Sequence, residues 1–252
     1  MSKTAQVTLW LLFACILVVV ISVALVTIDL DRITEKAIEA YGTEAAGVAV
    51  SVADADVSIG ERQARIDGVK VESPPGFLSK HVLGFGTIDV ALNVEASNED
   101  LVVIACLIVN DAHITIENSA RGQTNLEIIL ENLESNARDN VPARHAARGL
   151  KYIIEKLVFR GGELRVVDPS VDLDVAIAVP DLRLTSVGQD SGGATALQIR
   201  RRVAEAFVRT AMAGASDQLP QSALVDLDPI IRDLGVMLGG GEGIESHTTR
   251  IE

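Results

Sequence analysis

An uncharged, strongly apolar run near the start of the chain predicts a membrane-spanning helix. No charged residue occurs in residues 4–28, and residues 7–28 read VTLWLLFACILVVVISVALVTI. As a helix with 1.5 Å rise per residue, this run is about 33 Å long, enough to cross a hydrocarbon core of about 30 Å. The run continues directly into Asp29 without a small-residue cleavage site, so we interpret residues 1–28 as a retained anchor rather than a cleaved signal peptide.

Two features near the anchor leave its processing and orientation to be tested. Residues 12–15 (LFAC) faintly resemble a lipoprotein cleavage box, although a cysteine inside the membrane helix is the preferred interpretation of Cys15. Lys3 and the terminal amine precede the apolar run, and Arg32 and Lys36 follow it. The positive charges are therefore nearly balanced, and charge alone does not decide which side the rest of the chain faces.

Helical spacing continues past the predicted anchor and then gives way to alternation. Apolar residues recur at helical spacing from Leu30 to Tyr41, which predicts a juxtamembrane helix within residues 29–46 that ends near Gly42. Period-two alternation follows, with a shift of phase near Asp54 that suggests a bulge. The predicted strands of this first block cover residues 48–59, 64–71, 88–94, 101–109 and 114–117.

A second block repeats the layout of strands followed by a helix. Residues 125–138 predict the helix that ends the first block, and residues 140–149 a linker. Strands are expected at residues 152–159 and 164–167, joined by a turn at Gly161 and Gly162, and again at 171–179 and 182–184. A helix is expected at residues 194–213. Residues 216–252 predict a short amphipathic helix (230–238) and a polar, disordered tail.

This order of elements predicts the fold class α+β, mostly β, with two or three helices packed on an antiparallel sheet. Consecutive strands with short connections favour antiparallel pairing. We expect one sheet domain over residues 47–215. Aromatic residues make up only 3% of the chain, so its core must be built from Val, Ile, Leu and Ala.

Charge and cysteine content exclude several classes of function. The formal net charge is −13, which argues against nucleic acid as a partner because phosphate binding needs a dense Lys/Arg surface. The two cysteines do not form a disulfide framework. A local basic patch at residues 200–202, with Arg209, could meet lipid headgroups, but a solvated helix face is the preferred interpretation.

No pattern of residues predicts catalysis, a metal or a cofactor. The four histidines have no ligand spacing, and the chain has no H-E-x-x-H motif, nucleophile elbow or phosphate loop. Asp-x-Asp pairs at 54/56, 172/174 and 226/228 place carboxylates on one side of a strand, as Ca²⁺ would require, but no third ligand follows. Solvated strand edges explain these pairs better. We therefore expect no enzyme.

Several motifs, taken in order, resemble the bacterial AsmA-like family. Residues 47–97 resemble the start of such proteins, in which a strand, a glycine turn and a second strand precede Asn-Pro-x-Gly-Phe. Here Ser73 stands where that family usually has Asn. A strand at residues 114–117 and the segment that begins NLEIILEN also fit, and the resemblance covers roughly residues 28–213. The positions that carry the motifs are Pro74, Pro75, Gly76, Phe77, Asn125 and Leu126.

The resemblance implies a location, a shape and a process. It implies a single-pass protein of the cell inner membrane whose C-terminal domain lies in the periplasm. It also implies a curved sheet with an apolar concave face. Larger AsmA-like and TamB-like proteins are linked to outer-membrane biogenesis and to phospholipid movement between membranes.

The strand expected at residues 101–109 is apolar on both faces, which bears on the expected apolar concave face of the sheet. One face could pack on the body of the domain while the other lines a lipid groove; alternatively, helices cover both faces. The sequence does not decide which face would be the groove. Candidate groove residues are Ile88, Val90, Leu92, Val94, Val103, Leu107 and Val109.

Two functions remain open on this basis. The first is a lipid-handling envelope protein that binds or shields phospholipid acyl chains. The second is a membrane-tethered scaffold that binds a protein partner, with exposed strand edges available for pairing. Either function allows assembly with further copies or with another envelope protein.

Overall fold

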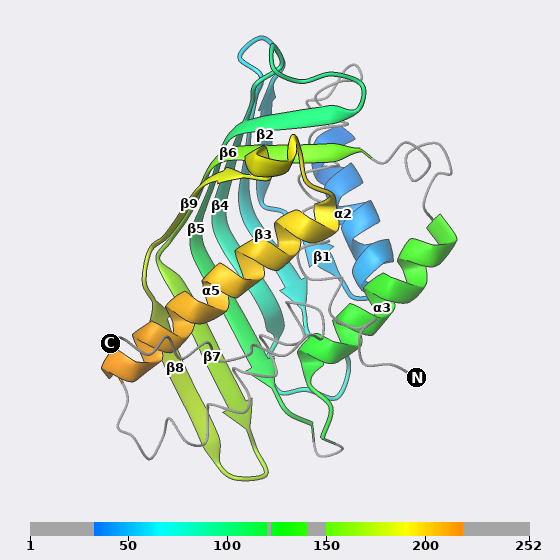
Figure 1. Ribbon diagram of the computed structural model, residues 1–252. Helices are drawn as coiled ribbons and strands as arrows, with labels where there is room; N and C mark the ends of the chain where they lie inside the picture. The colour runs from blue at the N-terminus through cyan, green and yellow to red at the C-terminus, as the bar shows by residue number, and fades with distance from the viewer. Residues whose placement is uncertain (1–32, 120–121, 141–149, 219–252) are drawn as a thin grey trace, which may run out of the picture.

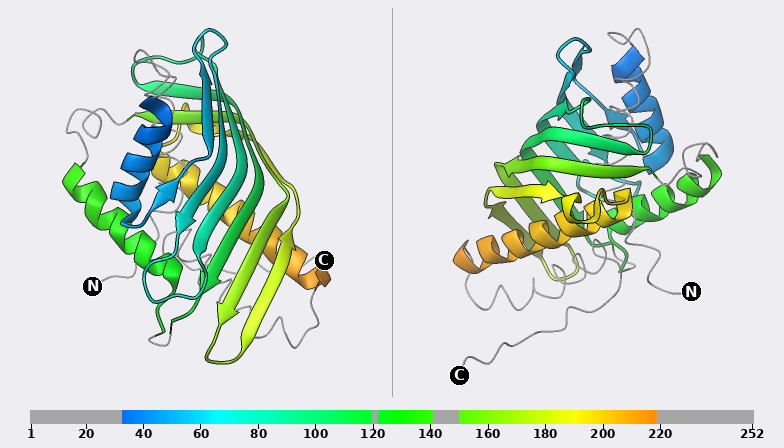
Figure 2. Two further views of the ribbon diagram at one scale, coloured as in Figure 1. Left: turned by 180° about the vertical axis from the view of Figure 1, so that it is seen from behind. Right: turned by 45° about the horizontal axis from the view of Figure 1, so that its top comes forward.

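The computed structural model describes residues 33–119, 122–140 and 150–218, which form one curved sheet with helices on a single face (Figures 1 and 2). The mostly β fold expected from the sequence is confirmed. Within the described ranges, no helix is both long and apolar enough to cross a membrane. The predicted anchor at residues 1–28 lies outside these ranges, as do residues 141–149 of the predicted linker and residues 219–252 of the C-terminal segment predicted at 216–252.

The sheet has nine strands and is accompanied by three α-helices and a 3-10 turn in the described residues. The helices are α2 (Ile33–Ala46), α3 (Asn125–Asn140) and α5 (Ala196–Gln218), and the 3-10 turn is η2 (Gln189–Ser191). The strands are β1 (Val50–Ser51), β2 (Asp54–Ser58), β3 (Gln63–Glu72), β4 (His81–Leu92), β5 (Leu101–Glu117), β6 (Lys151–Arg160), β7 (Gly162–Asp168), β8 (Leu173–Val179) and β9 (Leu182–Val187).

The nine strands form six rows across the sheet, which we call lines. Three of these lines consist of two consecutive strands that pair with the neighbouring line in a single register. β1 and β2 pair in the same register with β3, β6 and β7 with β5, and β8 and β9 with the β6–β7 line. The turn predicted at Gly161 and Gly162 is therefore wrong, since the chain passes straight from β6 into β7. The two strands predicted within residues 101–117 are likewise one strand, β5.

The sheet is mixed, which corrects the antiparallel prediction. β5 pairs in parallel with both β6 and β7, whereas the other pairings are antiparallel. Parallel neighbours need a crossover of a dozen or more residues, and the connection from β5 to β6 contains α3. The sequence shows a helix between two groups of strands, but not the pairing that this helix produces.

α2 continues beyond its predicted end at Gly42 and covers the edge of the sheet. A Cβ at Gly42 would lie 3.0 Å from Val50 Cγ1, so this glycine allows close packing on β1 rather than ending the helix. The helix instead ends before Gly47, whose φ of 66° suits the left-handed conformation. The Thr43 hydroxyl and the Glu39 carboxylate accept hydrogen bonds from Val50 N and Val52 N, each at 3.0 Å. These two hydrogen bonds satisfy edge donors at and next to β1, so α2 covers this part of the edge.

The other two helices confirm the predicted positions with longer bounds. α3 begins with a capping box, in which Thr124 Oγ1 accepts from Glu127 N at 3.1 Å and Glu127 accepts from Thr124 N at 2.8 Å. Asn132 of α3 donates to the carbonyl of Ala46 at 2.9 Å, which joins α3 to the end of α2. α5 runs past the domain boundary predicted at residue 215.

A transverse row of residues, which we call the seam, crosses the whole sheet. The registers place Gly68 opposite Gly86, Gly86 opposite Asp111, and Asp111 opposite Gly161. At the seam the buried positions are three residues apart instead of two, as at Val109 and Ala112. The seam consists of Ala53, Gly68, Gly86, Asp111, Gly161 and Pro180.

Backbone conformation explains the change of phase at the seam. Gly68, Asp111 and Gly161 have φ values of 63°, 53° and 64°, in the left-handed region that interrupts regular extended pairing. The phase shift predicted near Asp54 is confirmed, but it is not a local bulge, since the register of β1 and β2 against β3 is unbroken. All six lines shift together, which keeps one apolar face on the same side of the sheet.

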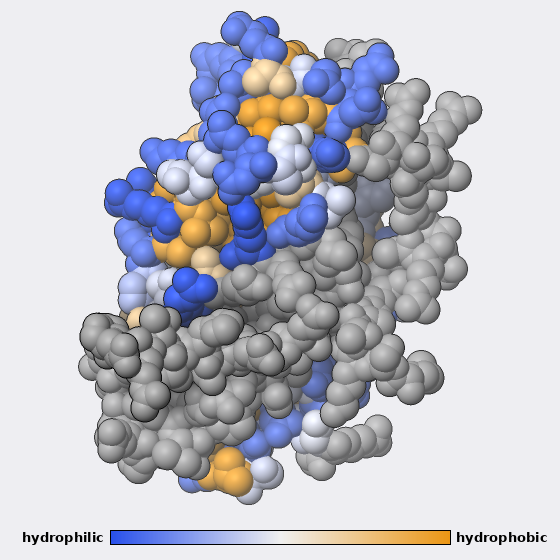
Figure 3. All heavy atoms as spheres, in the orientation of Figure 1, coloured by the Kyte–Doolittle hydropathy of each residue, from blue (hydrophilic) through white to orange (hydrophobic). Residues whose placement is uncertain are grey.

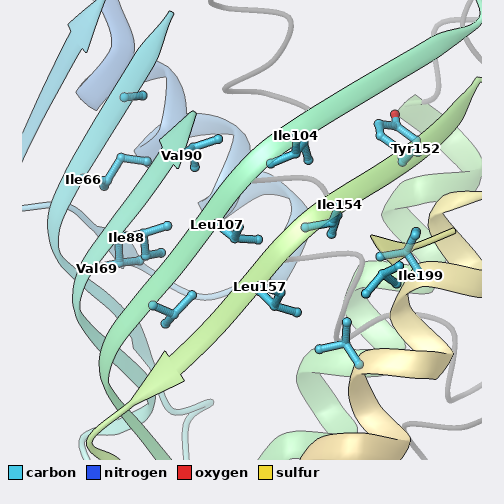
Figure 4. Packing of buried hydrophobic residues seen from close by; sticks show 14 of the residues in the cluster. Ile66, Val69, Ile88, Val90, Ile104, Leu107, Tyr152, Ile154, Leu157 and Ile199 are labelled. Atoms are coloured by element: carbon cyan, nitrogen blue, oxygen red, sulfur yellow. The ribbon is translucent and has the colours of Figure 1, made fainter. Parts of the chain in front are cut away.

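The core on this face divides into two clusters that lie largely on opposite sides of the seam, with Val69, Ala112 and Leu182 as the exceptions close to it. The first cluster joins β7 and β8 to α3 and α5, through residues such as Leu164, Leu126 and Phe207. The second cluster joins β2–β6 to Ile38 of α2 and to Ile199 of α5. Figure 4 shows the second cluster, in which the labelled strand residues point to the side of the sheet where Ile199 of α5 lies.

Candidate functional site

The predicted groove residues divide among three environments. Ile88, Val90, Leu107 and Val109 belong to the second cluster on the inner face, with exposed fractions between 2% and 7%. Leu92 is partly buried and packs against this cluster. Val103 is buried outside both clusters, and Val94 is 45% exposed. The structure thus brings five of the seven candidates together and separates Val103 and Val94 from them.

β5 changes face at Ala105, which corrects the predicted grouping of its side chains. Ile104 belongs to the second cluster together with Leu107, whereas Val103 does not. The register shifts here, because Leu92 is opposite Ile104 and Ala91 is opposite Cys106, so that Ala105 is an extra residue in β5. The prediction that Val103 shares one face of the strand with Leu107 and Val109 is therefore wrong.

The inner face of the middle strands is aliphatic apart from Tyr152 of β6, which belongs to the same cluster. We call this set the wall, and its members come from β3, β4, β5 and β6 (Figure 4). The exposed fractions of its members range from 0% to 7%. The wall consists of Ile66, Ile88, Val90, Ile104, Leu107, Val109, Ile154 and Leu157. No polar or charged side chain belongs to this set, so the wall offers apolar contact and no directional chemistry.

A buried polar network, which we call the clamp, lies at the end of β5. Glu117 is 2% exposed, and its two carboxylate oxygens accept hydrogen bonds from Leu78 N and Ser79 N, each at 2.6 Å. Asn125 is fully buried; its Oδ1 accepts from Glu117 N at 2.9 Å and its Nδ2 donates to the carbonyl of Thr115 at 3.0 Å. The clamp joins β5, the loop between β3 and β4, and the start of α3.

Hydrogen bonding decides the ionisation of the clamp carboxylate. Burial alone raises the pKa of Glu117, but the hydrogen bonds from Leu78 and Ser79 lower it more, so the net pKa is below its ordinary value. Glu117 is therefore ionised at neutral pH, and its charge is stabilised by backbone donors and the Ser79 side chain rather than by a basic side chain.

The clamp gathers the positions that carry the family resemblance. Pro74 is buried, Phe77 is half-buried, and Gly76 has a φ of 102° in the loop that precedes Leu78. Leu126 is buried next to Asn125 and belongs to the first cluster. Ser73, which replaces the usual Asn, has a buried Oγ without a hydrogen-bond partner among the described residues. These motif positions therefore build a structural joint, with Pro75 exposed at its tip.

Sequence reasoning missed Glu117 as a buried group. Period-two alternation groups it with His113 and Thr115, on the face opposite Ile114 and Ile116, and gives no sign of burial. The available signal was its position at the end of an apolar strand, a few residues before an asparagine that begins a helix.

The other candidate groups do not converge on a site. Asp174 pairs with Arg165 at 2.6 Å, and Asp54 and Asp56 are exposed. Arg202 lies 3.5 Å from Asp190, which agrees with a solvated helix face. The side chains of Arg200 and Arg201 lie outside the description. Across the described ranges, no group of three or more His, Cys, Asp or Glu side chains could hold a metal ion.

The two described histidines lie on the sheet without forming a catalytic pair. His113 is 3.8 Å from Glu163, and both side chains are about half exposed. Burial and the neighbouring Lys80 and Lys70 lower the pKa of His81. Within the described ranges, neither imidazole ring forms a hydrogen bond with a Ser or Cys side chain.

Comparison of the chain with models of known protein families, with curated proteins and with solved structures finds no match. The resemblance to the AsmA-like family therefore stays a prediction that rests on the order of the motifs.

Proposed function

We propose that this protein is an AsmA-like protein, anchored in the inner membrane and facing the periplasm, that binds phospholipid acyl chains along the wall during outer-membrane biogenesis. The observation that carries this proposal is the wall itself, an aliphatic surface shared by four neighbouring strands. An acyl chain on such a surface gains about 0.8 kcal/mol for each buried methylene group. No catalytic residue is required.

The arrangement of the helices supports the proposal. Among the strands, α5 packs mainly on β8 and β9 and α2 packs mainly on β1, so these helices meet the sheet near its opposite edges. Ile38 of α2 and Ile199 of α5 also belong to the cluster that contains the wall. The wall lies on the strands between them (Figures 2 and 4). An acyl chain that enters between α2 and α5 would therefore meet aliphatic side chains from β3 to β6.

The size of the sheet limits what one copy does. Six lines of strands at about 4.8 Å spacing are roughly 29 Å wide, less than the 40–45 Å of a bilayer with headgroups. One domain is thus too narrow to connect two membranes across its strands. It would take up lipid locally and pass it to a second copy or to another envelope protein.

A membrane-tethered scaffold that binds a protein partner is the second candidate. The low exposure of the wall favours it, because residues that are at most 7% exposed already have the environment of a filled core. In that case the wall stabilises the fold and binding takes place elsewhere.

Native mass spectrometry with lipid identification on the detergent-purified full chain separates the two functions. We expect wild type to carry phospholipid, and Leu107→Trp to remain folded and lose it, because the larger side chain occupies the space of an acyl chain. Ile108→Trp, one position along β5, is the control and should retain lipid. Wild type without lipid, or a Leu107→Trp protein that unfolds as an overpacked core does, would favour the scaffold.

A further inference from the structure

Both ends of the sheet carry exposed aliphatic side chains, but only one end lies beside the start of α2. Ile59, in the turn between β2 and β3, is 52% exposed, and Val94, in the loop between β4 and β5, is 45% exposed. Leu78 and Val171 are 81% and 70% exposed in loops at the opposite end. Figure 1 shows the start of α2 at the top, beside the first two loops, and the turn between β7 and β8 at the bottom.

Ile59 and Val94 belong to one surface because their two loops are in contact. Leu92 N donates to the carbonyl of Arg62 at 3.0 Å, and Arg62 lies 4.0 Å from the carboxylate of Glu95. We call these two loops, residues 59–62 and 93–100, the α2-start surface.

Hydrogen bonds fix the direction of α2 relative to the sheet. Thr43 bonds to Val50 N, and Glu39, one turn earlier in α2, bonds to Val52 N, further along the strand. α2 therefore runs antiparallel to the β1–β2 line, and its first residue, Ile33, lies toward the end of β2 and the turn that carries Ile59. A helix of 14 residues is about 21 Å long, so the far end of the sheet is well separated from this start.

The short connection between the predicted anchor and α2 would hold the end of the sheet that carries Ile59 and Val94 near the membrane. The apolar run ends at residue 28 and α2 begins at Ile33, five residues later. Five residues span at most about 18 Å even when fully extended. If residues 7–28 cross the bilayer, the start of α2 stays close to the lipid surface, and Leu78 and Val171 face away from it.

We propose that the α2-start surface rests on the bilayer, with Ile59 and Val94 inserted among the lipid headgroups. Its charge selects the kind of lipid: Glu61, Glu95, Glu99 and Asp100 are exposed on these loops, against one basic residue, Arg62. Such a surface is repelled by anionic headgroups and fits a zwitterionic lipid surface. This inference rests on the membrane attachment in the proposed function and is independent of lipid binding on the wall.

Tryptophan quenching in nanodiscs tests the orientation with matched controls. The chain has a single Trp, so each variant is made in the full chain with Trp10→Phe. Ile59→Trp and Val94→Trp report on the α2-start surface, and Leu78→Trp and Val171→Trp on the opposite end. All four positions are exposed in loops, so the substitutions should leave the fold intact, as checked by circular dichroism.

In phosphatidylcholine discs with brominated acyl chains, we expect quenching at Ile59→Trp and Val94→Trp to be at least twofold stronger than at the other two. Replacing half of the lipid with phosphatidylglycerol should weaken it, and high salt should restore it. Equal quenching at both ends, stronger quenching at Leu78→Trp or Val171→Trp, or none at all overturns the proposal. Quenching unaffected by phosphatidylglycerol overturns the choice of a zwitterionic surface. Lipid carried by the wall is measured separately by mass spectrometry, so failure of one proposal leaves the other readable.

Discussion

The wall and the clamp share strand β5, and they stabilise the structure by different means. The wall uses aliphatic side chains whose contribution depends on the volume buried and hardly on direction. The clamp uses one carboxylate and one amide whose four hydrogen bonds, between 2.6 and 3.0 Å, require those atoms in those places. Apolar contacts of the wall could be made by a ligand's acyl chain as well as by a side chain. The hydrogen bonds of the clamp could not be replaced in this way.

Among the changes considered, removing the clamp carboxylate should lower the free energy of unfolding the most. A small effect would mean that the clamp and the wall do not differ as described. Glu117→Ala leaves Leu78 N and Ser79 N without their acceptor, which we expect to cost on the order of 2–4 kcal/mol in the free energy of unfolding. Urea unfolding of the variant measures this. The control is Glu163→Ala, because Glu163 is exposed and its loss should stay within about 0.5 kcal/mol. Similar small losses for both variants would show that the clamp does not hold the loop.

The seam should respond strongly to a single methyl group. Gly161 has a φ of 64°, and a Cβ there would lie 2.7 Å from Asp111 Oδ1. Gly161→Ala should therefore cost about 1–3 kcal/mol through strain and displacement of Asp111. Gly60→Ala is the matched control, since nothing lies within 4 Å of its Cβ and its φ is not in the left-handed range. Equal melting temperatures for the two variants would mean that the seam adapts freely.

The sequence predicted the regular parts of this fold better than the parts that depend on long-range pairing. Period-two alternation located the strands around Val90 and Ile177, and helical spacing located α3 and α5, because both patterns are local. The passage from β6 into β7 was missed because Gly161 and Gly162 suit a turn as well as a seam. Only the partners of Gly161 on β5 distinguish the two, and a single sequence does not show them.

The sequence predicted four of the eight wall residues and missed the other four, on β3, β5 and β6. Ile88, Val90, Leu107 and Val109 were expected to share a face, and they do. Val103 was assigned to the same face because alternation carries no information about the extra residue at Ala105. Glu117 was missed for the opposite reason, since a charged residue at a strand end is usually solvated and its backbone donors come from a distant loop.

The clamp also predicts how stability changes with pH. The pKa of Glu117 is lowered in the folded protein, so the carboxylate contributes stability above its unfolded pKa of about 4.3, and this contribution is lost as the pH falls through the folded pKa. The free energy of unfolding, obtained from urea titrations between pH 7 and pH 3, should fall more steeply for wild type than for Glu117→Gln. Parallel curves for the two proteins would show that the carboxylate has no net preference for its charged form in the fold.

The smallest expected effect comes from a change on the wall that conserves volume. Leu107→Met keeps the size and apolarity of the side chain and alters only its shape, so we expect less than about 1.5 kcal/mol of lost stability. Glu117→Gln is the corresponding near-isosteric change in the clamp, and it should lose more, because an amide cannot accept both backbone hydrogen bonds with the same oxygen pair. Thermal melts of the two variants sharpen the comparison. A Leu107→Met protein that loses as much as Glu117→Gln would mean that the wall is fitted as tightly as a core. It would then have no room for an acyl chain, and the scaffold would be the better explanation of this fold.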